Sequence, residues 1–138
     1  MVHEMNLFAT FANIVGGRVP SDRTMDSIDH AAFFLGEQET SGREGIVVYV
    51  GKEIYGVKWR NWKMTFKEVE RGTDTVVEYL LPRFYYLYTD PKDEYPLLPG
   101  SLGNLWVRWP AGQVLTDHLV SLKAEPPVPP GAKDPYSP

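Results

Sequence analysis

The sequence predicts an α+β domain, with an antiparallel sheet of four or five strands arranged as a meander and an N-terminal and a C-terminal helix packed on it. Two observations lead to this prediction. The apolar residues follow a helical period near both ends of the chain and change to strand-like runs between about residues 46 and 88. The turns between these runs are too short for a parallel crossover, which needs about a dozen residues. We expect one domain over residues 1–123 and an extended, proline-rich tail over residues 124–138.

The N-terminal part of the chain predicts two helices. Asn6 is placed to cap the first, because its side-chain oxygen can accept a hydrogen bond from a free amide of the first turn. Apolar residues at positions 7, 8, 11, 14 and 15 then form one stripe, and Gly16 and Gly17 end the helix. A second, short helix is expected over residues 29–35, followed by a polar loop over residues 37–45.

The middle of the chain predicts strands. Residues 46–50 and 54–59 are rich in β-branched and aromatic side chains, and residues 62–67 alternate between apolar and polar. Two further strands are expected over residues 76–81 and 84–88. The helical period returns after Pro110, which suits a first helical turn. Its predicted apolar face consists of Val114, Leu115, His118, Leu119 and Leu122.

Composition excludes several classes of function. The chain carries 14 Lys and Arg against 18 Asp and Glu, a net charge of −4, which argues against a nucleic-acid partner. It contains no Cys, which excludes thiol catalysis, thiolate metal sites and disulfides. The longest apolar runs are far shorter than the roughly 20 residues that span a bilayer, and no signal peptide is visible. We therefore expect no membrane partner and, for the chain as written, a cytoplasmic location.

Few residues form a pattern with a chemical meaning. The histidines His3, His30 and His118 are widely separated and have no metal-ligand spacing, so no catalytic or metal-ligating residue is predicted. Asp90, with two further carboxylates three and four residues later, suggests either a site for a hard cation or a solvated turn before Pro91. The turn is the favoured interpretation.

The aromatic residues allow two interpretations. The first is an aromatic platform that stacks against a sugar or aryl ligand, formed by Trp59 and Trp62. The second places most of these rings in the core or at an interface, and strand and helix periodicity favours it.

Five strings, spread in order over nearly the whole chain, resemble the C-terminal domain of arylsulfatases, members of the sulfatase family in the alkaline phosphatase superfamily. Met-Asn-Leu-Phe-Ala-Thr at residues 5–10 resembles the family's Met-Asp-Leu-Phe-Pro-Thr segment, and residues 28–36 resemble the stretch that follows it. Residues 41–63 are similar to a hairpin that contains Val-Lys-Trp-Arg-x-Trp-Lys. Residues 84–91 and 129–136 resemble the family's Asp-Pro strand end and its Pro-Gly-x-x-Asp-Pro-Tyr ending.

The resemblance also implies what this chain lacks. Sulfatases cleave sulfate esters with a formylglycine made from the first residue of Cys/Ser-x-Pro-x-Arg, assisted by a calcium ion. This chain has no Cys, and none of its serines begins that motif. Calcium and formylglycine belong to the family's larger N-terminal catalytic portion, which is absent from this sequence. The resemblance therefore implies no catalytic residue and no cofactor in this chain, and no hydrolysis by the chain alone.

The resemblance implies that the chain acts as an interaction module. In the family this region packs beside the catalytic domain, so a bare apolar face is expected here, covered by a second copy of the chain or by a catalytic sulfatase domain. The alternatives are one part of a split arylsulfatase and a sugar- or aryl-binding module. The family's members are often exported, which leaves the compartment open. The candidate interface residues are Leu7, Phe8, Phe11, Trp106 and Trp109.

Overall fold

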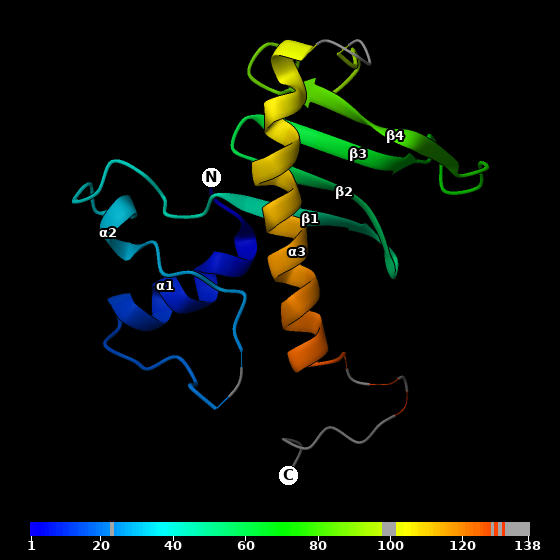
Figure 1. Cartoon of the computed structure of the whole chain (residues 1–138). Coiled ribbons are helices and arrows are strands. Elements are labelled where there is room, and N and C mark those ends of the chain that lie inside the picture. The colour runs from blue at the N-terminus through cyan, green and yellow to red at the C-terminus, as the bar shows by residue number, and fades with distance from the viewer. Residues whose placement is uncertain (23, 98–101, 128, 130, 132–138) are drawn as a thin grey trace.

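The computed structural model describes residues 1–22, 24–97, 102–127, 129 and 131 and confirms the α+β class (Figure 1). Most of the predicted tail, and the loop residues 98–101, lie outside the described residues. The N-terminal region forms a short 3-10 helix and two α-helices, and the sheet follows it. A second 3-10 helix leads into the long C-terminal helix. The elements are η1 (Glu4–Asn6), α1 (Leu7–Ile14), α2 (Ala31–Phe34), β1 (Gly45–Val50), β2 (Glu53–Trp59), β3 (Trp62–Glu68), β4 (Val77–Tyr86), η2 (Leu102–Val107) and α3 (Arg108–Ala124).

The sheet is the predicted antiparallel meander, with four strands in the order β1-β2-β3-β4. The two strands expected over residues 76–81 and 84–88 are one strand, β4. Its pairing with β3 is irregular, because Glu78 faces Lys67 whereas Arg83 faces Thr65. Pro82 lies within this irregular stretch, where a residue without a backbone N–H costs no regular ladder bond. The proline therefore interrupts the ladder without ending the strand.

One face of the sheet is covered by α3, which crosses the strands in Figure 1 and contacts β1, β2 and β3. The core between them contains Val57, Met64 and Ala111, with Val114 and Leu115 packed against it. Pro110 lies in the first turn of the helix, as predicted. The helix extends past the sheet beyond β1, so its predicted apolar face is only partly used and Leu119 is 42% exposed.

The N-terminal helix occupies a different place from the predicted one. Instead of packing on the sheet, α1 packs against η1 and α2 to one side of it (Figure 1). The predicted cap is also wrong, because the Asn6 side chain makes no capping bond and is fully buried. Its Oδ1 accepts hydrogen bonds from Nε and Nη2 of Arg43, at 3.0 and 2.6 Å. Gly16 ends the helix as predicted, with φ +71°.

Candidate functional site

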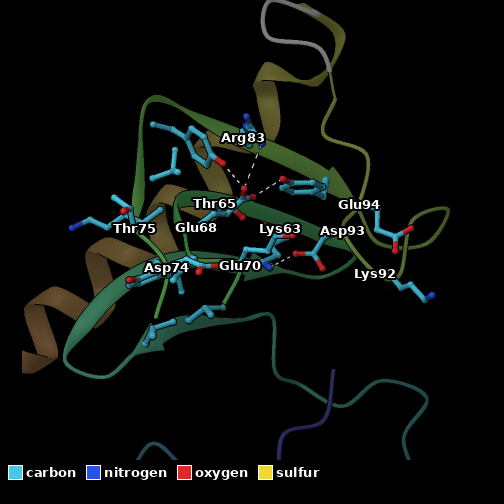
Figure 2. Close-up of a pocket in the computed structure, with 18 residues that line it drawn as sticks. Lys63, Thr65, Glu68, Glu70, Asp74, Thr75, Arg83, Lys92, Asp93 and Glu94 are labelled. Atoms are coloured by element: carbon cyan, nitrogen blue, oxygen red, sulfur yellow. Dashed lines mark hydrogen bonds and ion pairs between the residues drawn. The ribbon is translucent and has the colours of Figure 1, made fainter. Parts of the chain in front are cut away.

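A polar hollow of about 780 Å³ lies on the face of the sheet opposite α3 (Figure 2). Its floor is formed by strand residues that include Thr65 and Tyr85, and residues 69, 70, 74 and 75 and residues 92–94 line its rim. Alternation along β3 directs Met64 to the core and its neighbours Lys63 and Thr65 to the hollow. The two faces of the sheet therefore differ, one packed against a helix and one polar and open.

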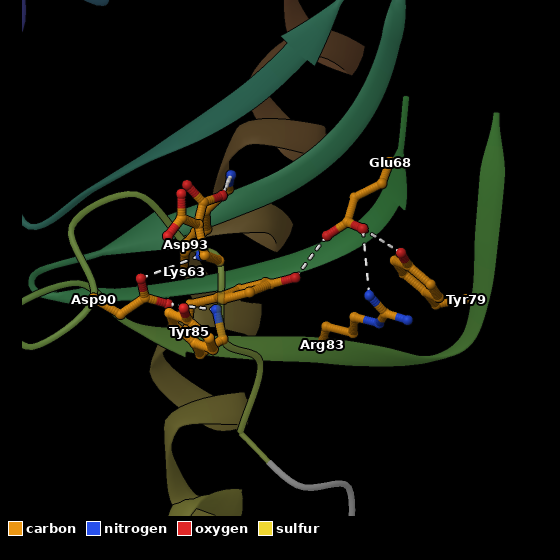
Figure 3. Close-up of polar contacts among 9 residues, drawn as sticks. Lys63, Glu68, Tyr79, Arg83, Tyr85, Asp90 and Asp93 are labelled. Atoms are coloured by element: carbon orange, nitrogen blue, oxygen red, sulfur yellow. Dashed lines mark hydrogen bonds and ion pairs between the residues drawn. The ribbon is translucent and has the colours of Figure 1, made fainter. Parts of the chain in front are cut away.

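Glu68 joins three side chains of β4 at one end of the hollow (Figure 3). Its Oε1 accepts a hydrogen bond from the hydroxyl of Tyr85 at 2.7 Å, and its Oε2 accepts one from the hydroxyl of Tyr79. Arg83 Nη1 lies 3.4 Å from the same Oε2, and the guanidinium carbon lies 4.1 Å from the centre of the Tyr79 ring. The irregular pairing of β4 makes this possible, because it brings Tyr79 to the same carboxylate as Tyr85.

The two lysines of the hollow are also paired. Lys63 donates to the carboxylate of Asp93, and Lys67 lies 2.9 Å from a carboxylate oxygen of Glu53 and 3.8 Å from one of Glu78. The hydrogen bond that Lys67 donates to Glu53 raises the pKa of Lys67. The three cations on the strands that form the floor of the hollow, Lys63, Lys67 and Arg83, therefore each have a carboxylate partner.

Thr65, unlike the charged residues of the hollow floor, has no partner for its polar group in the part of the chain that the structure describes. It is 3% exposed, and its hydroxyl has no hydrogen-bond partner among the described residues. A buried polar group without a partner costs roughly 1–3 kcal/mol, so such groups are uncommon in folded proteins. Thr65 lies on β3, where it faces Gly56 of β2 on one side and Arg83 of β4 on the other.

The Glu68 cluster shifts the titration of its members. Burial opposes the ionisation of Glu68, but the hydrogen bonds from Tyr79 and Tyr85 and the charge of Arg83 outweigh burial and lower its pKa. Burial, and then the hydrogen bond to Glu68, raise the pKa of Tyr85 to about 12, and the same causes raise the pKa of Tyr79. The cluster is therefore most stable with an ionised carboxylate and neutral phenols.

These shifts predict a loss of stability at high pH. Because the pKa of Tyr85 is raised on folding, its contribution is complete below about pH 10 and is lost as the pH rises through about 12. Tyr85→Phe removes this titration together with the bond to Glu68, so we expect it to cost about 1–2 kcal/mol at pH 7 and to flatten the decline between pH 10 and 12. Urea unfolding at pH 7, 10 and 11 measures both effects.

The matched control is Tyr88→Phe, since Tyr88 is 76% exposed. It should leave both the stability at pH 7 and the alkaline decline as they are in the wild-type chain. An alkaline decline in Tyr85→Phe as steep as that of the wild type would contradict the assignment.

The predicted aromatic residues meet in a second place, at the end of the sheet beside η2. The ring of Trp106 contacts Trp59 and Trp62, at centroid distances of 5.8 and 5.9 Å and near-perpendicular angles of 85° and 77°. Trp62 also contacts Tyr86 at 4.7 Å. Trp59 and Trp62, the predicted ligand platform, and Trp106, a predicted interface residue, therefore form one edge-to-face cluster. Trp109, which lies three residues after Trp106 in the first turn of α3, is 83% exposed and lines a shallow pocket with Leu105.

The other predicted interface residues lie on α1. Leu7, Phe8 and Phe11 are 37%, 51% and 58% exposed, and Ile14 and Val15 continue the apolar stripe at 53% and 79%. Few soluble monomers expose so continuous an apolar stripe. The structure separates this stripe from the tryptophans, so the five residues belong to two surfaces.

His30, His118 and Asp90 make contacts with neighbouring parts of the fold. His30 is buried and is bonded to Asn6 and to the carbonyl of Ile28, whereas His118 Nε2 lies 2.7 Å from the hydroxyl of Tyr49. Asp90 accepts hydrogen bonds from the backbone amides of residues 94 and 95, which confirms the turn. Within the described residues, no group of three or more His, Cys, Asp or Glu side chains is placed to hold a metal ion. No helix in that part of the chain is long and apolar enough to cross a membrane.

Sequence reasoning did not find the hollow. The alternation of residues 62–67 predicts a half-buried strand, but it gives no means of bringing Glu68 to Tyr79 and Tyr85. One feature of the sequence could have indicated the site. Tyr79, Arg83 and Tyr85 are all odd-numbered positions of one strand, so strand alternation would direct their side chains to the same face of the sheet.

Comparison with known proteins finds similarity to sulfatases. The chain is 25% identical over 119 residues to human arylsulfatase D, an alignment that covers 70% of this chain and 20% of that protein. The crystal structure of the PsFucS1 sulfatase from Pseudoalteromonas sp. matches 90% of this chain and 26% of its own, with a TM-score of 0.76 and 22% identity.

A second solved structure, described with the metabolism of multiple glycosaminoglycans by Bacteroides thetaiotaomicron, matches with a TM-score of 0.53 and 22% identity. It covers 87% of this chain and 24% of its own. No protein-family profile matches the chain. The chain thus spans about a fifth of the length of the curated relative it matches. In sequence and fold, the chain corresponds to the C-terminal part of a sulfatase.

Proposed function

We propose that this chain is an interaction module of the sulfatase type that has no sulfatase activity of its own. The observation that carries the proposal is the apolar stripe of α1, from Leu7 to Val15, which is exposed and does not pack on the sheet. Covering this stripe would remove apolar surface from water, which favours association by about 25 cal/mol per Å². The exposed Trp106 and Trp109, at the junction of η2 and the N-terminal end of α3, offer a second contact.

The absence of activity follows from the chemistry that sulfate ester hydrolysis needs. The resemblance places the formylglycine and the calcium ligands in the larger part of the family's chains, and the matched region covers only about a fifth of arylsulfatase D. The charged side chains on the floor of the hollow are paired: Glu68 accepts hydrogen bonds from two tyrosines, and Lys63 pairs with Asp93. The buried hydroxyl of Thr65 has no hydrogen-bond partner among the described residues, so no base is placed to activate it as a nucleophile.

For this chain on its own, we expect a second copy to cover the stripe, in a two-fold contact. Light scattering over a wide concentration range should show a dimer for the wild-type chain. The double variant Phe8→Glu/Phe11→Glu places two charges in the stripe and should be a monomer at every concentration. Leu80→Glu is the matched control, because Leu80 is 99% exposed on β4, away from α1, and it should still dimerise.

A wild-type chain that stays monomeric at all concentrations would contradict the self-association. The same preparation, supplied with calcium and 4-nitrophenyl sulfate, should release no 4-nitrophenol. Turnover by the purified chain would overturn the proposed lack of activity.

A second candidate function is one part of a split sulfatase, favoured by the fraction of the relatives that the chain spans, between 20% and 26%. Here the partner is a separate catalytic chain that supplies calcium and formylglycine. Affinity purification of the tagged chain from cells that express it would then yield sulfatase activity. The Phe8→Glu/Phe11→Glu variant should lose that activity, and an inactive wild-type eluate would count against the split enzyme.

A further inference from the structure

We propose that the hollow on the open face of the sheet binds a neutral, hydroxyl-rich ligand of the size of a sugar ring. The site is separate from the apolar stripe of α1 and from the tryptophan cluster, and it does not depend on the proposed interaction role. Three properties of the hollow lead to this assignment: its charge balance, its fixed donors and acceptors, and the unpaired hydroxyl of Thr65 (Figure 2).

The charge balance argues against an anion. The lining residues include four cations and five carboxylates, so the hollow as a whole is not positive. The cations on its floor are already paired: Lys63 with Asp93, Lys67 with Glu53, and Arg83 with Glu68. A sulfate or phosphate would have to displace a carboxylate from each cation that it approached, and it would meet the repulsion of those that remain. A neutral ligand meets neither obstacle.

The polar atoms of the hollow suit hydroxyl groups. A hydroxyl both donates and accepts a hydrogen bond, so it can bind beside a carboxylate and an ammonium group at once. Glu68, Tyr79 and Tyr85 are held in place by their mutual hydrogen bonds, so little side-chain freedom remains to be lost on binding. The ring of Tyr55 and the side chains of Val48 and Val50 give the hollow an apolar side against which the C–H face of a sugar ring can pack.

Thr65 is the group that a ligand would satisfy. Its hydroxyl is buried and lacks a partner among the described residues, which is the state that a ligand hydroxyl would relieve. Because the hydroxyl is covered in the free protein, a lining side chain must shift for the ligand to reach it. A buried water would satisfy Thr65 equally well, so the test has to distinguish water from a ligand.

The test uses saturation-transfer NMR with four neutral methyl glycosides, those of galactose, glucose, fucose and N-acetylglucosamine, and with the 6-sulfate of the galactoside. We expect saturation transfer to at least one neutral glycoside. In ¹H–¹⁵N spectra that glycoside should shift amides of residues 63–68 and 79–85. The four tryptophan indole signals should stay in place, since no Trp lines the hollow.

Thr65→Val replaces the hydroxyl with a methyl group of similar size. If the hydroxyl serves a ligand, the variant should be as stable as the wild type or more so, because it removes an unpaired buried group, and it should bind at least tenfold more weakly. If the hydroxyl is satisfied by a buried water, the variant should be less stable and no glycoside should bind. Thr116→Val is the control for binding, because Thr116 lies on α3 and is exposed.

Three results would overturn the proposal. The first is no saturation transfer to any neutral glycoside, and the second is binding by the sulfated galactoside alone. The third is a set of shifted signals that includes the indoles instead of the amides of β3 and β4.

Discussion

Gly56→Ala is expected to unfold the sheet or to cost at least about 3 kcal/mol of stability, because β2 has no room for a side chain at this position. A Cβ added at Gly56 would lie 2.6 Å from the backbone oxygen of Met64 and 3.3 Å from the Cα of Thr65. Both atoms belong to the backbone of β3, so no rotation of a side chain can relieve the contact. The strands would have to separate where Gly56 faces Thr65, beside the core residue Val57.

Urea unfolding followed by circular dichroism measures this loss, and Gly112→Ala is its matched control. Gly112 lies within α3, and a Cβ added there would meet nothing within 4 Å. Alanine is a better helix former than glycine by about 1 kcal/mol, so this variant should be more stable than the wild type. The two glycine-to-alanine changes thus have opposite expected signs. A Gly56→Ala chain within 1 kcal/mol of the wild type would show that β2 and β3 can move apart at little cost.

The elements that the sequence predicts correctly depend on residues that lie close together along the chain. The alternation of residues 62–67 and the short turns on both sides of it were sufficient for an antiparallel meander, since the sheet pairs neighbours in sequence. Pro110 and Gly16 marked helix ends for reasons that lie within a few residues of each. The extra break at Pro82 was an error of the same local kind, because a proline inside an irregular stretch need not end a strand.

The features that escaped prediction all depend on contacts between distant parts of the chain. Asn6 is of a residue type that often caps helices and directly precedes α1. Its side-chain oxygen instead accepts hydrogen bonds from Arg43, which lies 37 residues later. The hollow depends on Glu68 meeting residues of β4 across an irregular strand pair. The stripe of α1 was predicted correctly as apolar, but periodicity does not tell which surface an apolar face will meet.

Arg43→Ala is expected to release the N-terminal helices from the sheet without unfolding the sheet. Arg43 lies two residues before β1, and it donates to Asn6 from two nitrogens and to the backbone carbonyl of Asp26. Burial lowers the pKa of this guanidinium, against the opposing charge of Asp26. Without it, the buried Asn6 Oδ1 keeps, among the described residues, a 3.5 Å contact with the amide of Ile28. A loss of about 2–3 kcal/mol is expected for a charge-assisted bond to a buried group.

The loss should be local, because α1 packs on η1 and α2 and makes few contacts with the sheet. Hydrogen exchange should therefore become at least about 30-fold faster at the amides of α1 and α2, which is what 2 kcal/mol implies when exchange follows local opening. The amides of β2 and β3 should exchange within about threefold of their wild-type rates. Arg60→Ala is the control, since Arg60 pairs with Glu44 at an exposed position and such pairs contribute little.

A uniform acceleration over helices and sheet alike would show instead that the two parts unfold as one unit. If only the helices open, then the apolar stripe belongs to the least stable part of the chain, and whatever covers it stabilises that part most. The ordering of α1 and the burial of its stripe would then be one event, so a partner that binds Phe8 and Phe11 should restore slow exchange in Arg43→Ala. The position of Arg43 between the helices and β1 would in this way link the sheet to the surface that we propose for association.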